Sequence, residues 1–219
     1  MPETRLSASV QSSLLDHVSE HGSYSSPYFA KISNNFAVLD TADVADIAHF
    51  FCVLHGRHPG VVDHASIKTT EEEAREWFVK AMDGFAAERA FLTKLTVSAG
   101  PISGVSANDQ SNATVTAQCK ALEMLSQSDR SGCALGASLA LILDWQSIRS
   151  VLEQIALKLD VEPRQWPLPS VETTEALNAQ LSQSPAMARA INFGVDQILS
   201  QHRGLWQLLE ARRNVRAIG

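Results

Sequence analysis

The sequence is poor in cysteine and has no excess of basic charge and no long uninterrupted apolar run. Its three cysteines, Cys52, Cys119 and Cys133, are far apart and form no CxxC pair, which excludes a disulfide framework and a zinc ribbon. The most apolar stretch, residues 133–143, is too short to span a bilayer, so no membrane contact is expected. Residues 1–10 lack the apolar core of a signal peptide, and the predicted location is the cytoplasm.

The formal net charge is −6, and the basic residues are scattered apart from a short cluster near the C-terminus. A protein that binds the phosphate backbone normally presents a basic face, so nucleic acid is not an expected partner. Hydrophobic residues make up 45% of the chain and charged residues 19%, which is enough apolar material for a core. We therefore expect one folded domain over residues 1–219, with residues 1–35 as a loosely packed N-terminal segment.

Helical periodicity dominates the chain, and no alternating strand pattern is present. The pattern predicts an all-α bundle of about seven helices, whose three long members form its frame. Residues 23–35 and 100–112 are rich in Ser, Asn, Gly or Pro and are expected to be irregular. The predicted helices cover residues 6–22, 41–56, 70–99, 112–129, 133–160, 172–183 and 185–216.

Local signals support the ends of the long helices. Thr70 and Glu73 have the spacing of a capping box, and Pro185 after Ser184 is typical of a first helical turn. The helix at 133–160 is apolar nearly all round in its first half, which indicates a central position in the bundle. Small residues spaced by four on that helix, among them Gly136, would let a neighbouring backbone approach closely.

Each of the three long helices carries one ionisable residue on its apolar face. Glu88 falls on the apolar line of the first, Asp144 on that of the second and His202 on that of the third. A buried carboxylate needs a partner, and a structural ion pair of Glu88 with Arg89 or Arg149 is one interpretation. The alternative is that the three groups converge on a pocket inside the bundle.

Four of the seven histidines lie between residues 49 and 64, where a helix is expected to end. In the segment from His55 to His64, imidazoles and a carboxylate, Asp63, suit a transition metal. A second interpretation groups His55, Arg57 and His58 as an anion- or cofactor-binding cluster. A third is structural: His55 caps helix carbonyls, a Pro-Gly turn follows, and Asp63 caps the next helix. The sequence leaves all three open.

Two function classes follow from these features. The first is a metal- or cofactor-dependent, oxidative enzyme that binds iron, manganese or zinc. The second is a non-catalytic protein that binds a small apolar molecule, an anion or a protein partner; a homodimer is one further open arrangement. No GxGxxG, Walker or GxSxG motif and no HExxH spacing narrows the choice. The metal hypothesis uses the following six residues: His55, His58, His64, Glu88, Asp144 and His202.

Three sequence features together resemble an uncharacterised family of helical bacterial proteins. They are the run HGRHPGVVDHA at residues 55–65, GCALGA at residues 132–137 and the pair Asp144-Trp145. This resemblance implies a helical fold and assigns no activity and no site residue. In its number of helices the chain is also similar to haem-oxygenase-like and ferritin-like bundles, which is an analogy of fold alone.

Overall fold

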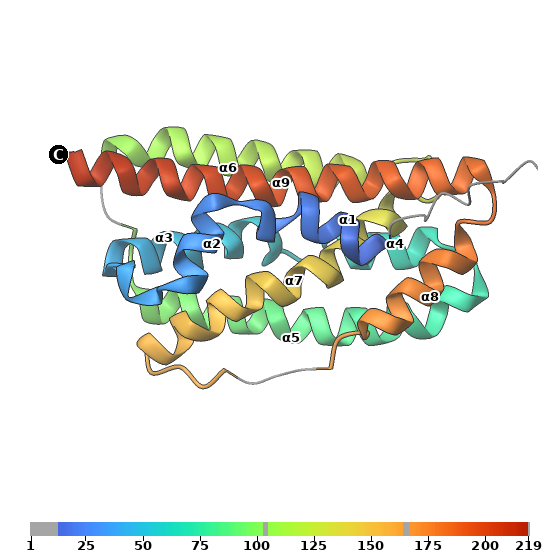
Figure 1. The fold of residues 1–219 in the computed structure, drawn as a ribbon, viewed down its shortest axis with the longest axis horizontal. Coiled ribbons are helices and arrows are strands. Elements are labelled where there is room, and N and C mark those ends of the chain that lie inside the picture. Colours follow the sequence, from blue (N-terminus) through green and yellow to red (C-terminus); the bar gives the residue numbers. More distant parts are fainter. Residues whose placement is uncertain (1–12, 103–104, 164–166, 219) are drawn as a thin grey trace, which may run out of the picture.

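The computed structural model describes residues 13–102, 105–163 and 167–218, in which the chain forms nine α-helices and no strand (Figure 1). The all-α class predicted from the sequence is confirmed. No helix of these segments is both long and apolar enough to cross a membrane. The helices are α1 (Leu14–His21), α2 (Pro27–Asn34), α3 (Thr41–His55), α4 (Val61–Lys68), α5 (Arg75–Ala99), α6 (Val105–Ser126), α7 (Cys133–Lys158), α8 (Val171–Leu181) and α9 (Pro185–Ile218).

The three long helices end within two residues of their predicted C-terminal ends, but the first begins later than expected. The predicted capping box of Thr70 and Glu73 does not form. Instead, Glu72–Ala74 is a 3₁₀ turn that leads directly into α5, and no side chain caps the α5 N-terminus. The hydrogen bonds of this turn provide partners for some of the backbone groups that a capping side chain would otherwise bind.

Two segments that the sequence predicts to be irregular are helical. Within residues 23–35, Ser26 accepts a hydrogen bond from the Phe29 amide and Pro27 occupies the first turn of α2, which is a complete N-terminal signal. Residues 105–112 belong to α6, because Ser and Asn lower helix propensity only slightly within a helix that packs against its neighbours. The first half of the predicted helix at 6–22 lies outside the described residues.

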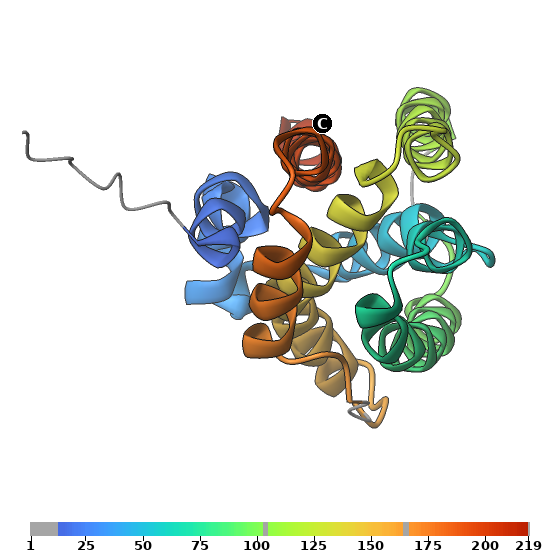
Figure 2. The same cartoon turned by 90° about the vertical axis from the view of Figure 1, so that its right-hand side faces the viewer.

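Helix α7 occupies the middle of the bundle, as Figure 2 shows along the long axis. It contacts every other α-helix of the described segments, most extensively α9. Every side chain from Cys133 to Trp145 is buried, which confirms the central position predicted from its composition. The N-terminal segment also joins the core: Tyr28, Phe29 and Ile32 of α2 are buried. Residues 1–12 of the predicted loose segment are outside the described range.

Glycines allow α7 and α9 to cross at very short distance. A β-carbon on Gly136 of α7 would lie 2.1 Å from the Ile191 carbonyl oxygen of α9. In the reverse direction, a β-carbon on Gly194 of α9 would lie 2.0 Å from the Cys133 carbonyl oxygen. Neither oxygen can move without displacing a helix backbone. The predicted close approach at the small residues of α7 is therefore present, and it fixes the depth at which Asp144 and His202 face each other.

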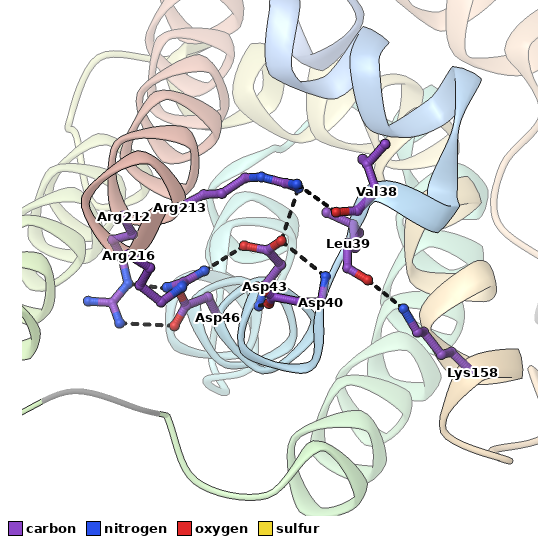
Figure 3. A network of polar contacts seen from close by, with 9 residues as sticks. All are labelled: Val38, Leu39, Asp40, Asp43, Asp46, Lys158, Arg212, Arg213 and Arg216. Atoms are coloured by element: carbon purple, nitrogen blue, oxygen red, sulfur yellow. Dashed lines mark hydrogen bonds and ion pairs between the residues drawn. The ribbon is translucent and has the colours of Figure 1, made fainter. Parts of the chain in front are cut away.

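Helix α9 also lies antiparallel to α3, and ion pairs join them at one end. Asp46 of α3 pairs with Arg212, whose Nε and Nη2 lie 2.9 and 3.0 Å from its two oxygens. Asp46 and Arg212 are 2% and 5% exposed, so this pair is almost fully desolvated. Figure 3 shows the full clamp, in which Arg213 and Arg216 reach Asp43 and Arg216 also reaches Asp46. The clamp sets the register of α3 against α9.

The close crossing yields a first prediction. Gly194→Ala should lower the free energy of unfolding by about 1–3 kcal/mol or more, because the new methyl group overlaps backbone atoms and not a movable side chain. The measurement is chemical denaturation of both proteins. Gly204→Ala on the same helix is the control, since its β-carbon meets only the end of the Gln118 side chain at 2.9 Å. Equal stability of the two variants would contradict the crossing.

The clamp yields a second prediction. Asp46→Ala should cost about 3–5 kcal/mol of stability, because it leaves a buried guanidinium without its counter-charge. Denaturation at neutral pH measures the loss, and Asp83→Ala, at an exposed position of α5, serves as the matched control. A cost for Asp46→Ala within about 0.5 kcal/mol of that of the control would show that water replaces the ion pair.

Candidate functional site

The last residue of α3, His55, is the outer end of a buried chain of hydrogen bonds. Its Nε2 lies 2.9 Å from Nε2 of His202 on α9. The ring stands edge-on to two aromatic side chains, Phe85 of α5 and Trp145 of α7, with centroid separations of 6.2 and 5.5 Å. Four helices therefore fix the position of this one imidazole. The structural interpretation of the sequence expected His55 to cap the helix carbonyls. Its Nε2 forms a hydrogen bond with His202 instead.

The chain continues from His202 to a carboxylate in the middle of α7. Nδ1 of His202 lies 2.6 Å from Oδ2 of Asp144, and both side chains are buried, at 0% and 1% exposure. Asp144 also accepts two hydrogen bonds from the backbone amide of Ser23, at 2.9 and 3.1 Å, and one from its hydroxyl at 2.7 Å. Three donors from two segments thus satisfy a carboxylate that has no arginine partner among the described residues.

The direction of each hydrogen bond follows from the donors at Asp144. The carboxylate accepts, so Nδ1 of His202 carries a hydrogen and donates it. In the neutral ring the other nitrogen, Nε2, is then the acceptor, and Nε2–H of His55 donates to it. This leaves Nδ1 of His55 as a nitrogen with a free lone pair, since no described residue donates to it. The chain is a relay of one carboxylate and two imidazoles.

Ser23 is a site residue that the sequence analysis missed. It follows Gly22 in the 3₁₀ turn Ser23–Ser25, within a segment that the sequence predicts to be irregular. A β-carbon on Gly22 would lie 2.6 Å from Oδ1 of Asp144 and 2.5 Å from the Val18 carbonyl oxygen. Only glycine lets the turn come this close to the carboxylate. A Gly-Ser pair is common in turns, so the sequence offers no specific signal for this role.

Burial sets the protonation state of His55. Desolvation of the ring, and then the neighbouring imidazole of His202, lower the pKa of His55 well below its ordinary value. The ring is therefore neutral at physiological pH, which agrees with the donor and acceptor roles above. A neutral imidazole with a free nitrogen is a base and a hydrogen-bond acceptor rather than a positive charge.

His55 also lines a pocket of about 190 Å³ between the end of α3, the start of α4 and the last turns of α6. Its walls include Leu54, Val61, Phe85, Leu122 and Leu141. Arg57, His58, His64 and Glu123 supply the ionisable groups toward solvent. The pocket therefore brings together the three residues of the predicted anion- or cofactor-binding cluster, His55, Arg57 and His58. It also adds His64 from the metal hypothesis.

Glu88 lies apart from this chain, although it is buried as predicted. Its oxygens accept hydrogen bonds from Arg149 at 2.6 Å and from the indole nitrogen of Trp145 at 3.1 Å. The Arg149 guanidinium also stacks over the Phe91 ring at 4.0 Å. The structural ion pair that the sequence offered as one interpretation, Glu88 with Arg149, is present. Trp145 lies between the two systems, with its ring against His55 and its nitrogen on Glu88.

His58 belongs to a third group, at the start of α4. Its Nδ1 lies 3.4 Å from Oδ2 of Asp63, and Arg89 reaches the same carboxylate at 2.9 Å. Asp63 also accepts the Gly60 amide at 2.7 Å, which confirms its predicted role as a cap of the helix that follows. Hydrogen bonds and ion pairs of Asp63 thus hold the short connection between α3 and α4.

The six residues of the metal hypothesis are thus divided. Asp144, His202 and His55 lie in one chain, His58 pairs with Asp63, His64 faces the pocket and Glu88 pairs with Arg149. Among the described residues no group of three or more His, Cys, Asp or Glu side chains is arranged to hold a metal ion. The facing nitrogens of His55 and His202 are at hydrogen-bond distance, which leaves no room for a metal between them.

Comparison with known proteins places most of the chain in one family. The model of a family of unknown function (DUF6975) matches residues 18–217, a range that contains Ser23, His55, Asp144 and His202. No curated protein and no solved structure matches the chain. The similarity in helix number to haem-oxygenase-like and ferritin-like bundles therefore has no support from these comparisons.

The buried imidazole pair predicts how stability depends on pH. The folded pair has room for one added proton, because a second would place two positive charges 2.9 Å apart, whereas both imidazoles bind protons in the unfolded chain. Well above about pH 6.5 the His55 imidazole is neutral in both the folded and the unfolded state, so its lowered pKa does not change the stability there. Below that pH the unfolded state binds more protons, so the free energy of unfolding should fall as pH falls.

Denaturation of the wild type and of His55→Gln over this pH range measures the effect. The wild-type slope below about pH 6.5 should be steeper by up to about 1.4 kcal/mol per pH unit, because the variant lacks one of the two groups. His49→Gln, which removes an imidazole of the same helix outside the pocket and the relay, is the matched control. Parallel curves for wild type and His55→Gln would show that His55 titrates normally in the folded protein.

Proposed function

We propose that this chain, which belongs to the DUF6975 family of unknown function, binds a small molecule in the pocket at the end of α3 and exchanges a proton with it through His55. One observation carries the proposal: the same imidazole lines the pocket and ends the buried relay of Asp144 and His202. A histidine that only filled the core would need neither contact with a cavity nor a second imidazole behind it.

The relay gives the positive charge of a protonated His55 a second imidazole to move to, which an isolated buried histidine does not have. A proton that Nδ1 of His55 accepts would leave a positive charge in a desolvated position, which the lowered pKa of this group opposes. If the Nε2–H bond of His55 breaks as a bond forms between that hydrogen and Nε2 of His202, His55 is neutral again. The charge then resides on His202, 2.6 Å from the Asp144 carboxylate. One proton enters, one moves, and the number of protons is conserved.

The surroundings keep this path dry and ordered. His202 and Asp144 are essentially without solvent exposure, and His55 is 5% exposed, so water competes little with the hydrogen bonds of the relay. The donors of Ser23 hold the carboxylate, and the carboxylate fixes the tautomer of His202. This is the role that a buried carboxylate has behind a catalytic imidazole in acid–base chemistry. Return of the proton to the bound molecule follows the same steps in reverse.

Nitrogen NMR of the folded protein labelled at histidine tests the relay without any ligand. At neutral pH we expect His202 in the Nδ1–H form and His55 in the Nε2–H form. On acidification, the first proton taken up by the pair should turn His202 into imidazolium and switch His55 to the Nδ1–H form. His55→Gln and His49→Gln assign the signals, and only the first should remove the switch.

Two outcomes would refute the proposal. One is a neutral-pH His55 that carries its hydrogen on Nδ1, because the ring nitrogen that does not contact His202 would then be a donor instead of a base. The other is an imidazolium at His55 with a neutral His202 after proton uptake, because the charge would then stay at the pocket and the relay would be inactive. An unchanged His202 signal during the tautomer switch of His55 would count against it equally.

A further inference from the structure

We infer that the ligand of this pocket is a small organic acid whose carboxylate binds Arg57 at the mouth and whose other end carries a proton-bearing polar group, such as a hydroxyl, that reaches His55. This inference rests on the proposed function, since it assumes that His55 acts on the molecule in the pocket. It names the class of molecule from the residues that line the pocket, among which Arg57 is exposed and His55 is buried.

The mouth of the pocket favours a negative group. Arg57 is exposed there, and no carboxylate of the described residues lies within ion-pair distance of it. Glu123 is the one carboxylate among the lining residues. Burial raises the pKa of the Cys119 thiol, which lines the same pocket; of the two charges near it, Arg57 lowers that pKa more strongly than Glu123 raises it. At the Cys119 thiol, the positive charge of Arg57 therefore has a larger effect than the negative charge of Glu123.

Two histidines at the mouth of the pocket can also donate hydrogen bonds to a negative group. His64 is half-buried in the pocket wall, and exposed His58 is held by Asp63 beside Arg89. A planar carboxylate matches the fork of the Arg57 guanidinium, and imidazole N–H groups beside it can complete its hydrogen bonds. A cationic ligand would meet Arg57 with the wrong sign and would have only Glu123 as a partner.

The buried part of the pocket lining favours a ligand that has an apolar body and a polar end. Leucine, valine and phenylalanine side chains form the apolar part of the lining, and the His55 ring packs edge-on against one of them, Phe85. Cys119, Ser126 and Gln127 also line the pocket. A volume of about 190 Å³ is below the ~300–1,000 Å³ typical of sites for drug-sized ligands, so the molecule is a small one. A hydroxyl of the ligand would give Nδ1 of His55 the donor that no described residue provides.

Binding of a defined probe set to the whole protein tests the inference. The probes are 4-hydroxybenzoate and the ω-hydroxy acids of three to six carbons, each compared with its primary amide and with the acid that lacks the hydroxyl. Binding is followed at millimolar concentration by the NMR signals of His55 and by thermal stability. We expect at least one hydroxy acid to bind, its amide to bind about tenfold more weakly or worse, and the acid without the hydroxyl to leave the His55 nitrogen signals unmoved.

Variants separate recognition at the mouth from chemistry at the interior. Arg57→Gln should weaken binding of the acid about tenfold or more, while Arg75→Gln, at an exposed arginine of α5 paired only with Glu72, should leave it unchanged. Because Arg57 is exposed, its replacement should not unfold the protein, and an unchanged melting temperature without ligand verifies this. The relay titration described above needs no ligand and is run on the same variants.

The outcomes are distinguishable from those that bear on the proposed function. Amides that bind as well as acids, binding that ignores Arg57→Gln, or no binding of any acid in the set would overturn the inference, while a normal relay titration would leave the relay standing. If an acid binds with dependence on Arg57 but the relay titration fails, the proposed proton exchange is wrong and recognition of the acid stands. Binding with both dependences supports the two proposals together.

Discussion

A carboxylate that is buried in the central helix, and that no arginine of the described residues pairs with, is the constraint from which the rest of this structure can be understood. Asp144 lies on α7, which contacts every other α-helix of the described segments, and its desolvation would be prohibitive without donors. The donors come from distant parts of the sequence: Ser23 in the N-terminal segment and His202 in the last helix. Satisfying one side chain therefore ties both ends of the chain to its middle, and a second imidazole, His55, satisfies the nitrogen that His202 leaves over.

The geometry of that chain depends on contacts far from it. Glycines at the α7–α9 crossing bring Asp144 and His202 to hydrogen-bond distance, and the arginine clamp fixes how far α3 extends along α9. A shift of one residue in the pairing of Asp46 with Arg212 would move His55 about 1.5 Å along the axis and rotate it by about 100°, away from His202. The ion pairs at one end and the imidazole pair at the other are thus two measures of a single register.

The sequence predicts the helices well because their periodicity and ends are local properties. It also predicts that Glu88, Asp144 and His202 are buried, since each falls on an apolar line. It cannot predict which of them meet: a line on a helix gives a face but neither the rotation of the partner helix nor its depth, and Glu88 proves to face Arg149 instead of the other two. Ser23 acts through its backbone as well as its hydroxyl, and a backbone donor has no sequence signature. The clamp has a signal in the sequence: two acids three residues apart, at 43 and 46, and two arginines four residues apart, at 212 and 216.

The division of the buried charges into separate systems has its own consequence for function. Glu88 and Asp144 are both buried carboxylates next to Trp145, yet one is balanced by a permanent cation, Arg149, and the other by a group that can gain or lose a proton. A guanidinium fixes the charge of its partner at all physiological pH values, whereas an imidazole lets the local charge change by one when a proton arrives. The relay is the one of these two systems that ends at a ring lining the pocket of Arg57. A chain that needed only stability could have used arginine at both places; with imidazoles at one of them, the charge of the buried core can change by one proton.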